Sequence, residues 1–473
     1  MEGFAPKPEE NQNQVSATDL FVPTATTTSA INATQGSSVL DSDLKDALAA
    51  TVQAPVIASE DADHDHGNPG SKPESHVDLN AVDIKSIDLS NATGRRSVGK
   101  LVRMALSGGD FLDPGAGNNT VIAGGGNDII VGKGGGINTF TTGTGRDAIV
   151  LGAETTNRIF DFDPTKDTIA IDSSVAMENI VVAQGKNPGK GGLKQPFDSV
   201  NNTLIIDKSA NHILGVLTFT KAESLTSKNF VQVQSELVDR IGQFGRFSNT
   251  QETGDGGQQL NGTTGRDKMI GRGGDDFLFV GDDGFKIGTA KGGGGTEFPF
   301  RTDSPGTSEL NAELKGGVLN ISGSYKDFDG APLFSQGETE LDPKTRILNG
   351  SDPKALIDGF LKVPKDVEGN NLSGTHMHFS PADDSRGNFA DATVVRYLSE
   401  TITDAKSGTF SGQFKLTPEE QAALLAGNLY VNAHTNVDLD GDGEAGFATG
   451  ENRLNFNQNT MQFTQRSREF FRS

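Results

Sequence analysis

The sequence lacks residues and patterns that several classes of protein require. Its 473 residues contain neither cysteine nor tryptophan, so no disulfide can form, and stability outside a cell has to come from packing and bound metal. No stretch approaches the roughly 18 apolar residues of a transmembrane helix. Basic residues number 41 against 63 acidic ones, a net charge of -22, which disfavours nucleic-acid binding because that needs a basic face.

Two catalytic motifs are also missing. The chain has no G-x-S-x-G nucleophile elbow and no H-E-x-x-H zinc helix, which argues against the serine hydrolases and metalloproteases built on them. The first residues, MEGFAPKPEENQNQ, lack the basic region and apolar run of a Sec-type signal peptide.

Glycine, by contrast, is abundant at 60 residues, and many of these glycines belong to one regular repeat. A glycine is followed two residues later by Asp or Asn, and after two more by a large apolar residue; this happens five times, in steps of nine, nine, ten and nine. The longer step accommodates Lys133. The polar positions are Asp110, Asn119, Asp128, Asn138 and Asp147. The apolar positions are Leu112, Val121, Ile130, Phe140 and Ile149.

This pattern matches calcium-binding nonapeptides. Glycines permit positive φ, which lets backbone carbonyls converge on a cation, and Ca²⁺ takes six to eight oxygens from carbonyls and carboxylates. The apolar residues should point inward, so that stacked repeats share one thin core. The alternative is a glycine-rich linker with chance acidic residues, but five consecutive matches in three features favour the repeat.

Stretches such as AGGGNDIIV and TGTGRDAIV closely resemble the repeats of the hemolysin-type (RTX) family. In that family one coil of a parallel β-roll comprises two nonapeptides, and an ion lies between turns about eighteen residues apart on the same edge. The resemblance therefore implies that Asp110, Asp128 and Asp147 share one edge and that Asn119 and Asn138 share the other. Because affinity follows ligand charge, the all-Asp edge should bind Ca²⁺ more tightly.

The residues after the repeats predict a cap and then a weaker second block. The segments RIFDFDPTKDTIAID, NTLIID and ILGVLTF alternate apolar residues as strands do, and a repeat stack needs an atypical end unit, as RTX proteins have. Farther on, Asp267 and Asp276 repeat nine residues apart as weaker calcium ligands. Their neighbours in register, Gln258 and Phe285, are not acidic. We expect a degenerate roll or a link packed on a neighbour.

Composition divides the chain into five parts. Residues 1–98 are polar and should be disordered, 99–235 hold the roll and cap, and 236–297 hold the second block and a linker. Residues 298–458 contain many short strands typical of an antiparallel β-sandwich or barrel, and 459–473 form a tail. The expected fold is therefore mainly β.

The N-terminal part contains three histidines among acidic residues, His64, His66 and His76. A weak metal-binding tract is one interpretation, and a solvated linker is the better one. In the C-terminal part, TPEEQAALLAG predicts a helix with Thr417 as N-cap, Pro418 in the first turn and Gly427 at its end.

Three motifs in residues 298–458 resemble the CHRD domain, first described in chordin: SGTHMHFS, NLYVNAHT and ENRLNFN. The family's last motif usually reads G-G-E-I-R-G; Glu451 and Arg453 match it, whereas its glycines are absent. The family's biochemical function is poorly defined, so the resemblance implies a β-sandwich rather than an activity.

The histidines of these motifs suggest a metal site. On a strand, His376 and His378 point to one face, about 7 Å apart at Cα, and imidazole pairs bind Cu²⁺ or Zn²⁺. His434 is the natural third ligand, and the G-x-H-x-H strand also resembles copper–zinc superoxide dismutases. The alternative is that these histidines only hydrogen-bond neighbouring strands. With three histidines, no cysteine and no histidine-rich zinc loop, the domain is not expected to turn over superoxide.

An acidic loop follows His434. Asp438, Asp440, Asp442 and Gly443 match the opening of a calcium loop. Position twelve is Thr449 rather than Glu, so an EF-hand is excluded, leaving a shorter calcium loop or an exposed acidic turn.

The leading hypothesis is a secreted bacterial protein of the cell surface or extracellular matrix, calcium-binding and non-enzymatic. Its roll would fold on Ca²⁺, and its CHRD-like domain would contact an extracellular protein or polysaccharide. The RTX resemblance implies export by type I secretion machinery, for which the C-terminal tail is a candidate signal. The alternative is a copper-binding metalloprotein or oxidoreductase that uses the three histidines.

Overall fold

The computed structural model describes most of the chain from residue 75 onward. The described residues are 75–93, 99, 102–103, 107–187, 193, 195–263, 265–280, 285–297, 301–330, 340–342, 361–362, 374–380, 393–404, 406–435, 450–456 and 461–463. The predicted calcium loop at Asp438, Asp440 and Asp442 lies outside them, as do His64 and His66.

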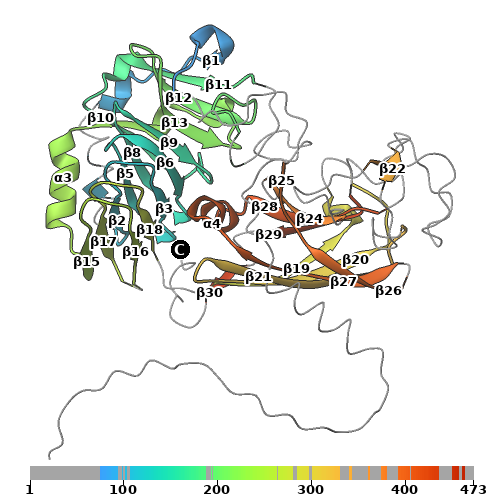
Figure 1. The fold of residues 1–473 in the computed structure, drawn as a ribbon. Coiled ribbons are helices and arrows are strands. Elements are labelled where there is room, and N and C mark those ends of the chain that lie inside the picture. The colour runs from blue at the N-terminus through green and yellow to red at the C-terminus, as the bar shows by residue number, and fades with distance from the viewer. Residues whose placement is uncertain are drawn as a thin grey trace, which may run out of the picture. The chain divides into compact units, whose positions relative to one another are not determined.

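Two largely parallel sheets face each other and form a β-roll (Figure 1). The first sheet consists, in spatial order, of β1 (Asp83–Lys85), β11 (Ile180–Gln184), β12 (Asn202–Asp207), β13 (His212–Thr218), β9 (Thr155–Ile159), β6 (Gly136–Thr141), β3 (Thr120–Ile122), β18 (Phe277–Phe279) and β16 (Gln259–Asn261). The second consists of β14 (Phe230–Val233), β10 (Thr168–Asp172), β8 (Ala148–Leu151), β5 (Ile129–Gly132), β2 (Phe111–Asp113), β17 (Asp267–Ile270) and β15 (Asn249–Glu252).

The apolar residue of each repeat fills the space between the two sheets. Leu112, Val121, Ile130, Phe140 and Ile149 are all fully buried in one cluster. Successive repeats alternate between the sheets, so strands that pair in one sheet come from every second repeat, as in the pairing of β5 with β8. The predicted inward face of the repeats is confirmed.

The second repeat block continues the same roll. β17 pairs in parallel with β2, and β18 pairs in parallel with β3. Residues 249–279 are thus stacked in space before the first coil, although they follow it in the sequence. The block gains its stability from this stacking, because two repeats alone bury too little apolar surface.

The cap comprises the predicted strands, and it also includes a segment before them. β11, β12 and β13 form an antiparallel sheet, and β1 pairs with β11. The expectation that residues 1–98 are disordered is therefore wrong for residues 75–93. The reason is burial: Val77 and Val82 pack into an apolar cluster with Ile206 of β12.

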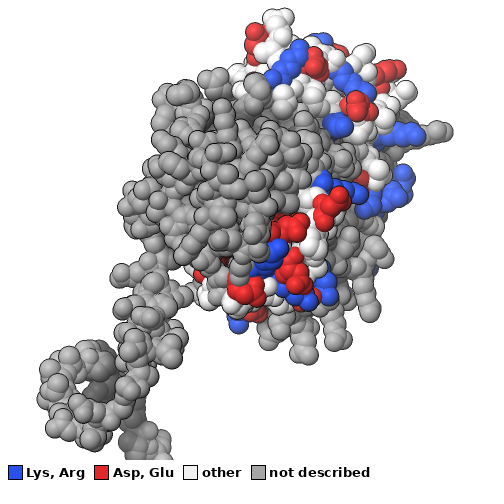
Figure 2. All heavy atoms as spheres, turned by 90° about the vertical axis from the view of Figure 1, so that its right-hand side faces the viewer, with Lys and Arg blue, Asp and Glu red and all other residues white. Residues whose placement is uncertain are grey.

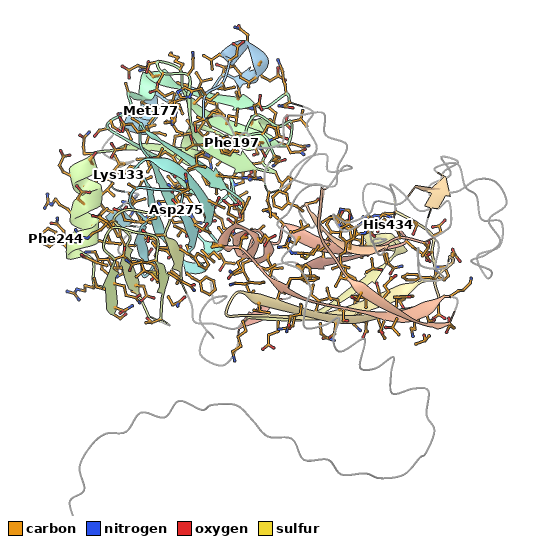
Figure 3. All side chains as sticks on the ribbon, in the orientation of Figure 1. Lys133, Met177, Phe197, Phe244, Asp275 and His434 are labelled. Atoms are coloured by element: carbon orange, nitrogen blue, oxygen red, sulfur yellow. The ribbon has the colours of Figure 1, made fainter. Side chains whose placement is uncertain are left out.

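A helix covers the outer face of the second sheet. α3 (Ser235–Phe244) packs Val238 and Ile241 against Phe111 and Val150 (Figure 1). Its Ser235 hydroxyl donates to Asp172 Oδ2 at 2.7 Å. The opposite side of the helix faces outward, since Asp239 and Gln243 are exposed. Phe244, the last residue of the helix, is 74 % exposed (Figure 3).

The C-terminal part is an antiparallel, nearly closed barrel. Its strands follow the order β25 (Thr393–Tyr397), β24 (Thr375–Phe379), β28 (Leu429–Ala433), β29 (Asn452–Phe456), β19 (Phe285–Gly293), β20 (Thr307–Lys315), β21 (Val318–Lys326), β27 (Ser407–Lys415) and β26 (Ser399–Asp404). Leu398 alone separates the two end strands, and its N–H donates to Thr375 O at 3.0 Å. The predicted fold class is confirmed.

The barrel extends beyond the expected range of 298–458 at both ends. β19 begins at Phe285, and β30 (Met461–Phe463) pairs with β19.

The smaller elements are β4 (Gly125–Gly126), β7 (Thr144–Gly145), β22 (Glu340–Asp342), β23 (Leu361–Lys362) and short 3-10 turns at Leu79–Ala81, Ser90–Thr93, Met177–Asn179, Ala222–Ser224, Ser227–Asn229 and Gly294–Thr296.

The predicted barrel helix is α4 (Pro418–Leu425). Thr417 and Glu420 form a reciprocal capping box, so the cap expected from the sequence is confirmed. The helix contacts β3 and β6 of the roll. Thr141 Oγ1 donates to Ala422 O at 2.7 Å, and Asn428 Nδ2 donates to Phe160 O at 2.8 Å.

Neither acidic nor basic residues dominate the described part of the face drawn in Figure 2. Figure 2 shows acidic and basic side chains interspersed there. No helix in the described part of the chain is long and apolar enough to cross a membrane.

Candidate metal sites

One edge of the roll carries a ladder of buried aspartates. Asp110, Asp128 and Asp147 stand in successive coils, and each accepts from its neighbour through Oδ1. The N–H of Asp110 donates to Asp128 at 2.7 Å, and that of Asp128 donates to Asp147 at 2.8 Å. The structure therefore brings the three residues together on one edge, in the register that the sequence predicts.

The second carboxylate oxygens of this ladder have different surroundings. Oδ2 of Asp128 and Oδ2 of Asp147 are buried and have no hydrogen-bond partner among the residues that the structure describes. Both residues are fully buried. An ionised carboxylate oxygen without a partner in the interior is strongly unfavourable, so these atoms call for a cation or a proton.

Stacked glycine turns lie beside the carboxylate of Asp128, whose Oδ1 would be 2.8 Å from a Cβ at Gly126. Gly126 and Gly145 have φ of 144° and 140°, and a Cβ at Gly145 would collide with Gly126 O. Thr144 N donates to Gly124 O at 2.7 Å, which aligns the two turns. Only glycine permits this approach, which brings the backbone carbonyl of one turn close to the next turn. Carbonyl and carboxylate oxygens are the ligands of Ca²⁺.

The burial of so many acids raises their pKa values in the absence of a cation. Burial, and then the charge of Asp128, raises the pKa of Asp110 to about 9. Burial raises the pKa of Asp128 to about 7. Burial, and then the charges of Asp128 and Asp167, raise the pKa of Asp147 well above its usual value. The ladder therefore needs a counter-charge to be ionised at neutral pH.

The opposite edge carries amides that satisfy one another. Asn119 Nδ2 donates to Asn138 Oδ1 at 3.1 Å, and Asn138 Nδ2 donates to Asn157 Oδ1 at 3.0 Å. Asn157 Nδ2 donates in turn to Leu214 O at 3.1 Å. An amide supplies both a donor and an acceptor, so this ladder closes without an ion.

The second block places its two aspartates at the start of these ladders. Asp267 N donates to Asp110 Oδ1 at 2.6 Å, and Asp276 N donates to Asn119 Oδ1 at 2.7 Å. The sequence spacing offers these residues no acidic neighbour in register, but the fold gives Asp267 one from 157 positions away. Both are buried.

Sequence reasoning missed several members of the ladders. Asp167 accepts from Asp147 N at 3.0 Å through Oδ1 and from Asp163 N at 2.8 Å through Oδ2, so the cap closes the aspartate edge. Asn157 ends the amide ladder. Asn249 lies at the other end of the aspartate edge, where its Nδ2 donates to Asp267 Oδ1 at 2.8 Å. Neither residue has a glycine two positions earlier. A spacing of about eighteen to twenty residues from a recognised position was the only available signal.

The barrel brings together the three predicted histidines. Each of His376, His378 and His434 offers a ring nitrogen, and these nitrogens all lie within 4.8 Å of one another. All three side chains are buried. In Figure 3 His434 is seen in the barrel, just beyond the end of β28.

Strand register explains this convergence. His376 faces Asn432 and His378 faces Tyr430 on the adjacent β28. Met377 and Phe379, the alternate residues of β24, belong to the barrel's apolar core. The histidines thus occupy the other side of the sheet.

Aromatic and cationic groups surround the histidines. The ring of His378 stacks on Tyr430 at 4.9 Å between centroids, and Arg453 lies 3.6 Å from the Tyr430 ring centre. Glu451 accepts from Thr435 Oγ1 at 2.6 Å, and burial raises its pKa. The two matched residues of the closing motif, Glu451 and Arg453, are therefore both buried next to this region.

No protein-family model and no curated protein matches the chain. The two sites consequently rest on their geometry. One offers hard oxygen ligands in a ladder, which suits Ca²⁺, and the other offers three imidazoles, which suit Cu²⁺ or Zn²⁺.

Proposed function

We propose that this is a calcium-binding protein whose β-roll folds when Ca²⁺ occupies the aspartate edge. The observation that carries the proposal is the pair of buried, unpartnered Oδ2 atoms of Asp128 and Asp147. Asp128 would serve ions on both sides, shared with Asp110 and with Asp147. The carboxylate oxygens and the adjoining glycine turns support Ca²⁺ over softer metals.

Calcium binding and folding would then be one equilibrium. The roll has a thin core, and ordering each residue costs roughly 1–2 kcal/mol of backbone entropy. A site assembled from separate coils does not exist in the unfolded chain, so its binding free energy stabilises the folded state.

The test compares the full chain in chelator, in millimolar CaCl₂ and in millimolar MgCl₂. We expect hydrogen exchange of β5 and β8 amides to slow in calcium only, with a gain of β signal in far-UV circular dichroism. Peptides from β20 and β21 in the barrel serve as the internal control. Identical exchange and identical spectra in chelator and in calcium would refute the proposal.

The biological setting follows from the resemblances. The RTX-like repeats favour a secreted bacterial protein exported by type I machinery, and low cytosolic calcium would keep the chain loose during export. The CHRD-like barrel would contact an extracellular protein or polysaccharide in a non-enzymatic role. Detection of the native protein in culture medium or on the cell surface, lost when the exporter is deleted, tests this setting.

A second function is favoured by a separate observation, the convergence of three buried imidazoles within 4.8 Å. His376, His378 and His434 would hold Cu²⁺ or Zn²⁺. Copper bound there would supply one-electron chemistry, whereas zinc would supply charge, rigidity and Lewis acidity without redox chemistry. We propose a structural metal centre, with redox activity as the alternative.

Metal-dependent melting of the full chain distinguishes these possibilities. Cu²⁺ or Zn²⁺ should raise the melting temperature of the barrel by binding linkage, and His378→Ala should abolish that rise. His212→Ala, in the cap, is the control, because His212 lies outside the cluster. No shift in the unmodified chain would reject the site, and consumption of superoxide by the copper form would establish the redox alternative.

A further inference from the structure

The ring of His378 belongs to a column of side chains from three adjacent strands. β24, β28 and β29 are neighbours in the barrel sheet (Figure 1). His378 stands opposite Tyr430 in the register of β24 with β28, and the planes of the two rings differ by only 16°. A guanidinium 3.6 Å from the Tyr430 ring centre and an imidazole 4.9 Å from it cannot share one face of that ring. Tyr430 therefore lies between His378 and Arg453.

The other two histidines do not set the plane of the His378 ring. The rings of His376 and His434 stack on each other, 21° apart in plane and 4.7 Å apart at their centroids. The ring of His378 is inclined by 61° to His376 and by 53° to His434. Its orientation therefore follows Tyr430, whereas the other two rings support each other.

The far end of the column is fixed as well. Arg453 is buried, and its Nε donates to Asn455 Oδ1 at 2.8 Å. A desolvated guanidinium over a tyrosine face is attracted by the negative face of the ring. Tyr430 is also buried, so water does not compete for either face, and the ring is clamped from the side away from the histidines.

Tyrosine is scarce in this protein, which makes its placement informative. Two of the three tyrosines in the sequence contact the histidine cluster. Tyr430 stacks on His378, and Tyr397 meets His376 edge-on with the ring centroids 5.5 Å apart. The third, Tyr325, packs in the apolar core of the barrel instead.

We propose that Tyr430, clamped by Arg453, is a positioning residue that fixes the ring of His378 for metal binding. This inference rests on the proposed histidine centre and adds two residues that bind no metal themselves. Partners behind metal-ligating histidines set the ring orientation, and their loss typically costs about 10–100-fold in metal affinity. The column also gives the motifs NLYVNAHT and ENRLNFN a role beyond His434, since each supplies one member.

The experiment measures Zn²⁺ affinity of the full chain by titration calorimetry with ZnCl₂, in buffer that contains CaCl₂. The ion that His378→Ala removes defines the site. Tyr430→Leu lacks the ring but keeps apolar bulk, and it should bind that ion about 10–100-fold more weakly. Tyr430→Phe keeps the stacked ring and should retain the affinity. Electron paramagnetic resonance after loading with CuCl₂ should show an altered spectrum for Tyr430→Leu and an unaltered one for Tyr430→Phe.

A matched control removes the buried tyrosine that does not stack on a histidine. Tyr325 stacks on Phe328 with the ring centroids 4.7 Å apart. Tyr325→Leu should therefore lower the melting temperature of the barrel while leaving the zinc affinity and the copper spectrum unchanged. A loss of zinc affinity equal to that of Tyr430→Leu would show that general loosening of the barrel is responsible, and the positioning role would be wrong.

The arginine tests the clamp through the sign of its effect. Removal of a positive charge alone should strengthen the binding of a divalent cation, whereas release of Tyr430 should weaken it. Arg453→Met should therefore bind zinc more weakly than the unmodified protein, by less than Tyr430→Leu does. Tighter binding would mean that Arg453 acts through its charge, and the clamp would be wrong. This variant decides the matter where Tyr430→Leu does not fold, as judged by hydrogen exchange of β20 and β21.

The remaining outcomes separate this inference from the function on which it rests. If Tyr430→Leu folds and binds zinc as the unmodified protein does, the positioning role is wrong and the histidine centre stands. If Tyr430→Phe loses as much affinity as Tyr430→Leu, the hydroxyl matters rather than the stacked ring, and the positioning role is wrong. If the unmodified chain binds no ion that His378→Ala removes, the histidine centre is wrong and the positioning role fails with it.

Discussion

The two edges of the roll have the same backbone geometry, but at each ladder position an Asp carries Oδ2 where an Asn carries Nδ2. On one edge Asp128 accepts a hydrogen bond through Oδ1 and leaves Oδ2 unpaired. On the other, Asn138 accepts through Oδ1 from Asn119 and uses its Nδ2 to donate to Asn157. The comparison shows that the coil geometry by itself does not require an ion. A cation or a proton is needed where the ladder residue can accept but cannot donate.

The largest expected effect is a difference in calcium affinity between two variants, each of which lacks one ladder side chain on one edge. Asp128→Ala should weaken calcium affinity by about tenfold or more, since ligand charge count sets affinity. Asn138→Ala should leave affinity nearly unchanged and cost about 1–3 kcal/mol of stability with or without calcium, because buried amide partners lose their bonds. Calcium titrations and denaturant unfolding of both variants measure the difference. Equal losses of affinity would mean that both edges bind ions.

The second expected effect is a reversal in the pH dependence of stability. Without calcium, the pKa values of Asp128 and Asp110 are raised to about 7 and about 9, above the unfolded value of about 3.9. The stability that these two protonated carboxyls contribute to the folded roll is therefore fully present below about pH 4. It is lost as the pH rises through 7 to 9. In chelator, the melting temperature of the roll should fall between about pH 5 and pH 8.

Calcium should invert this trend, because the ion binds the ionised carboxylates and competes with protons. In saturating CaCl₂ the same melting temperature should rise over the same pH range. Thermal scans at matched ionic strength compare the two conditions. Parallel pH profiles with and without calcium would show that the ion does not bind the buried aspartates.

The smallest effect on stability should follow from placing an aspartate on the amide edge. Asn138→Asp keeps the acceptor for Asn119 but removes the donor to Asn157, and it buries a new charge. In chelator this should cost about 1–3 kcal/mol, and calcium should restore part of that loss. Unfolding of this variant in both conditions is the measurement. A loss that calcium does not reduce would show that the turns of the amide edge cannot accommodate an ion.

Much of this molecule follows from local sequence. The spacing of Asp110, Asp128 and Asp147 fixes their common edge, since two nine-residue repeats complete one coil. The alternation of glycine, polar and apolar residues fixes which side chains face the core. Thr417, Pro418 and Glu420 specify the start of α4 through short-range hydrogen bonds and a fixed φ.

Other features were decided only by the tertiary structure. Nothing in the spacing of Asp267 and Asp276 reveals that they precede Asp110 and Asn119 in the stack, because parallel pairing places no limit on the sequence between two strands. The ordered segment 75–93 depends likewise on apolar surface supplied by the distant cap. His434 approaches His376 and His378 through the register of β24 with β28. Sequence determines which groups each segment carries and on which face, whereas burial and strand pairing across long separations determine which of those groups meet.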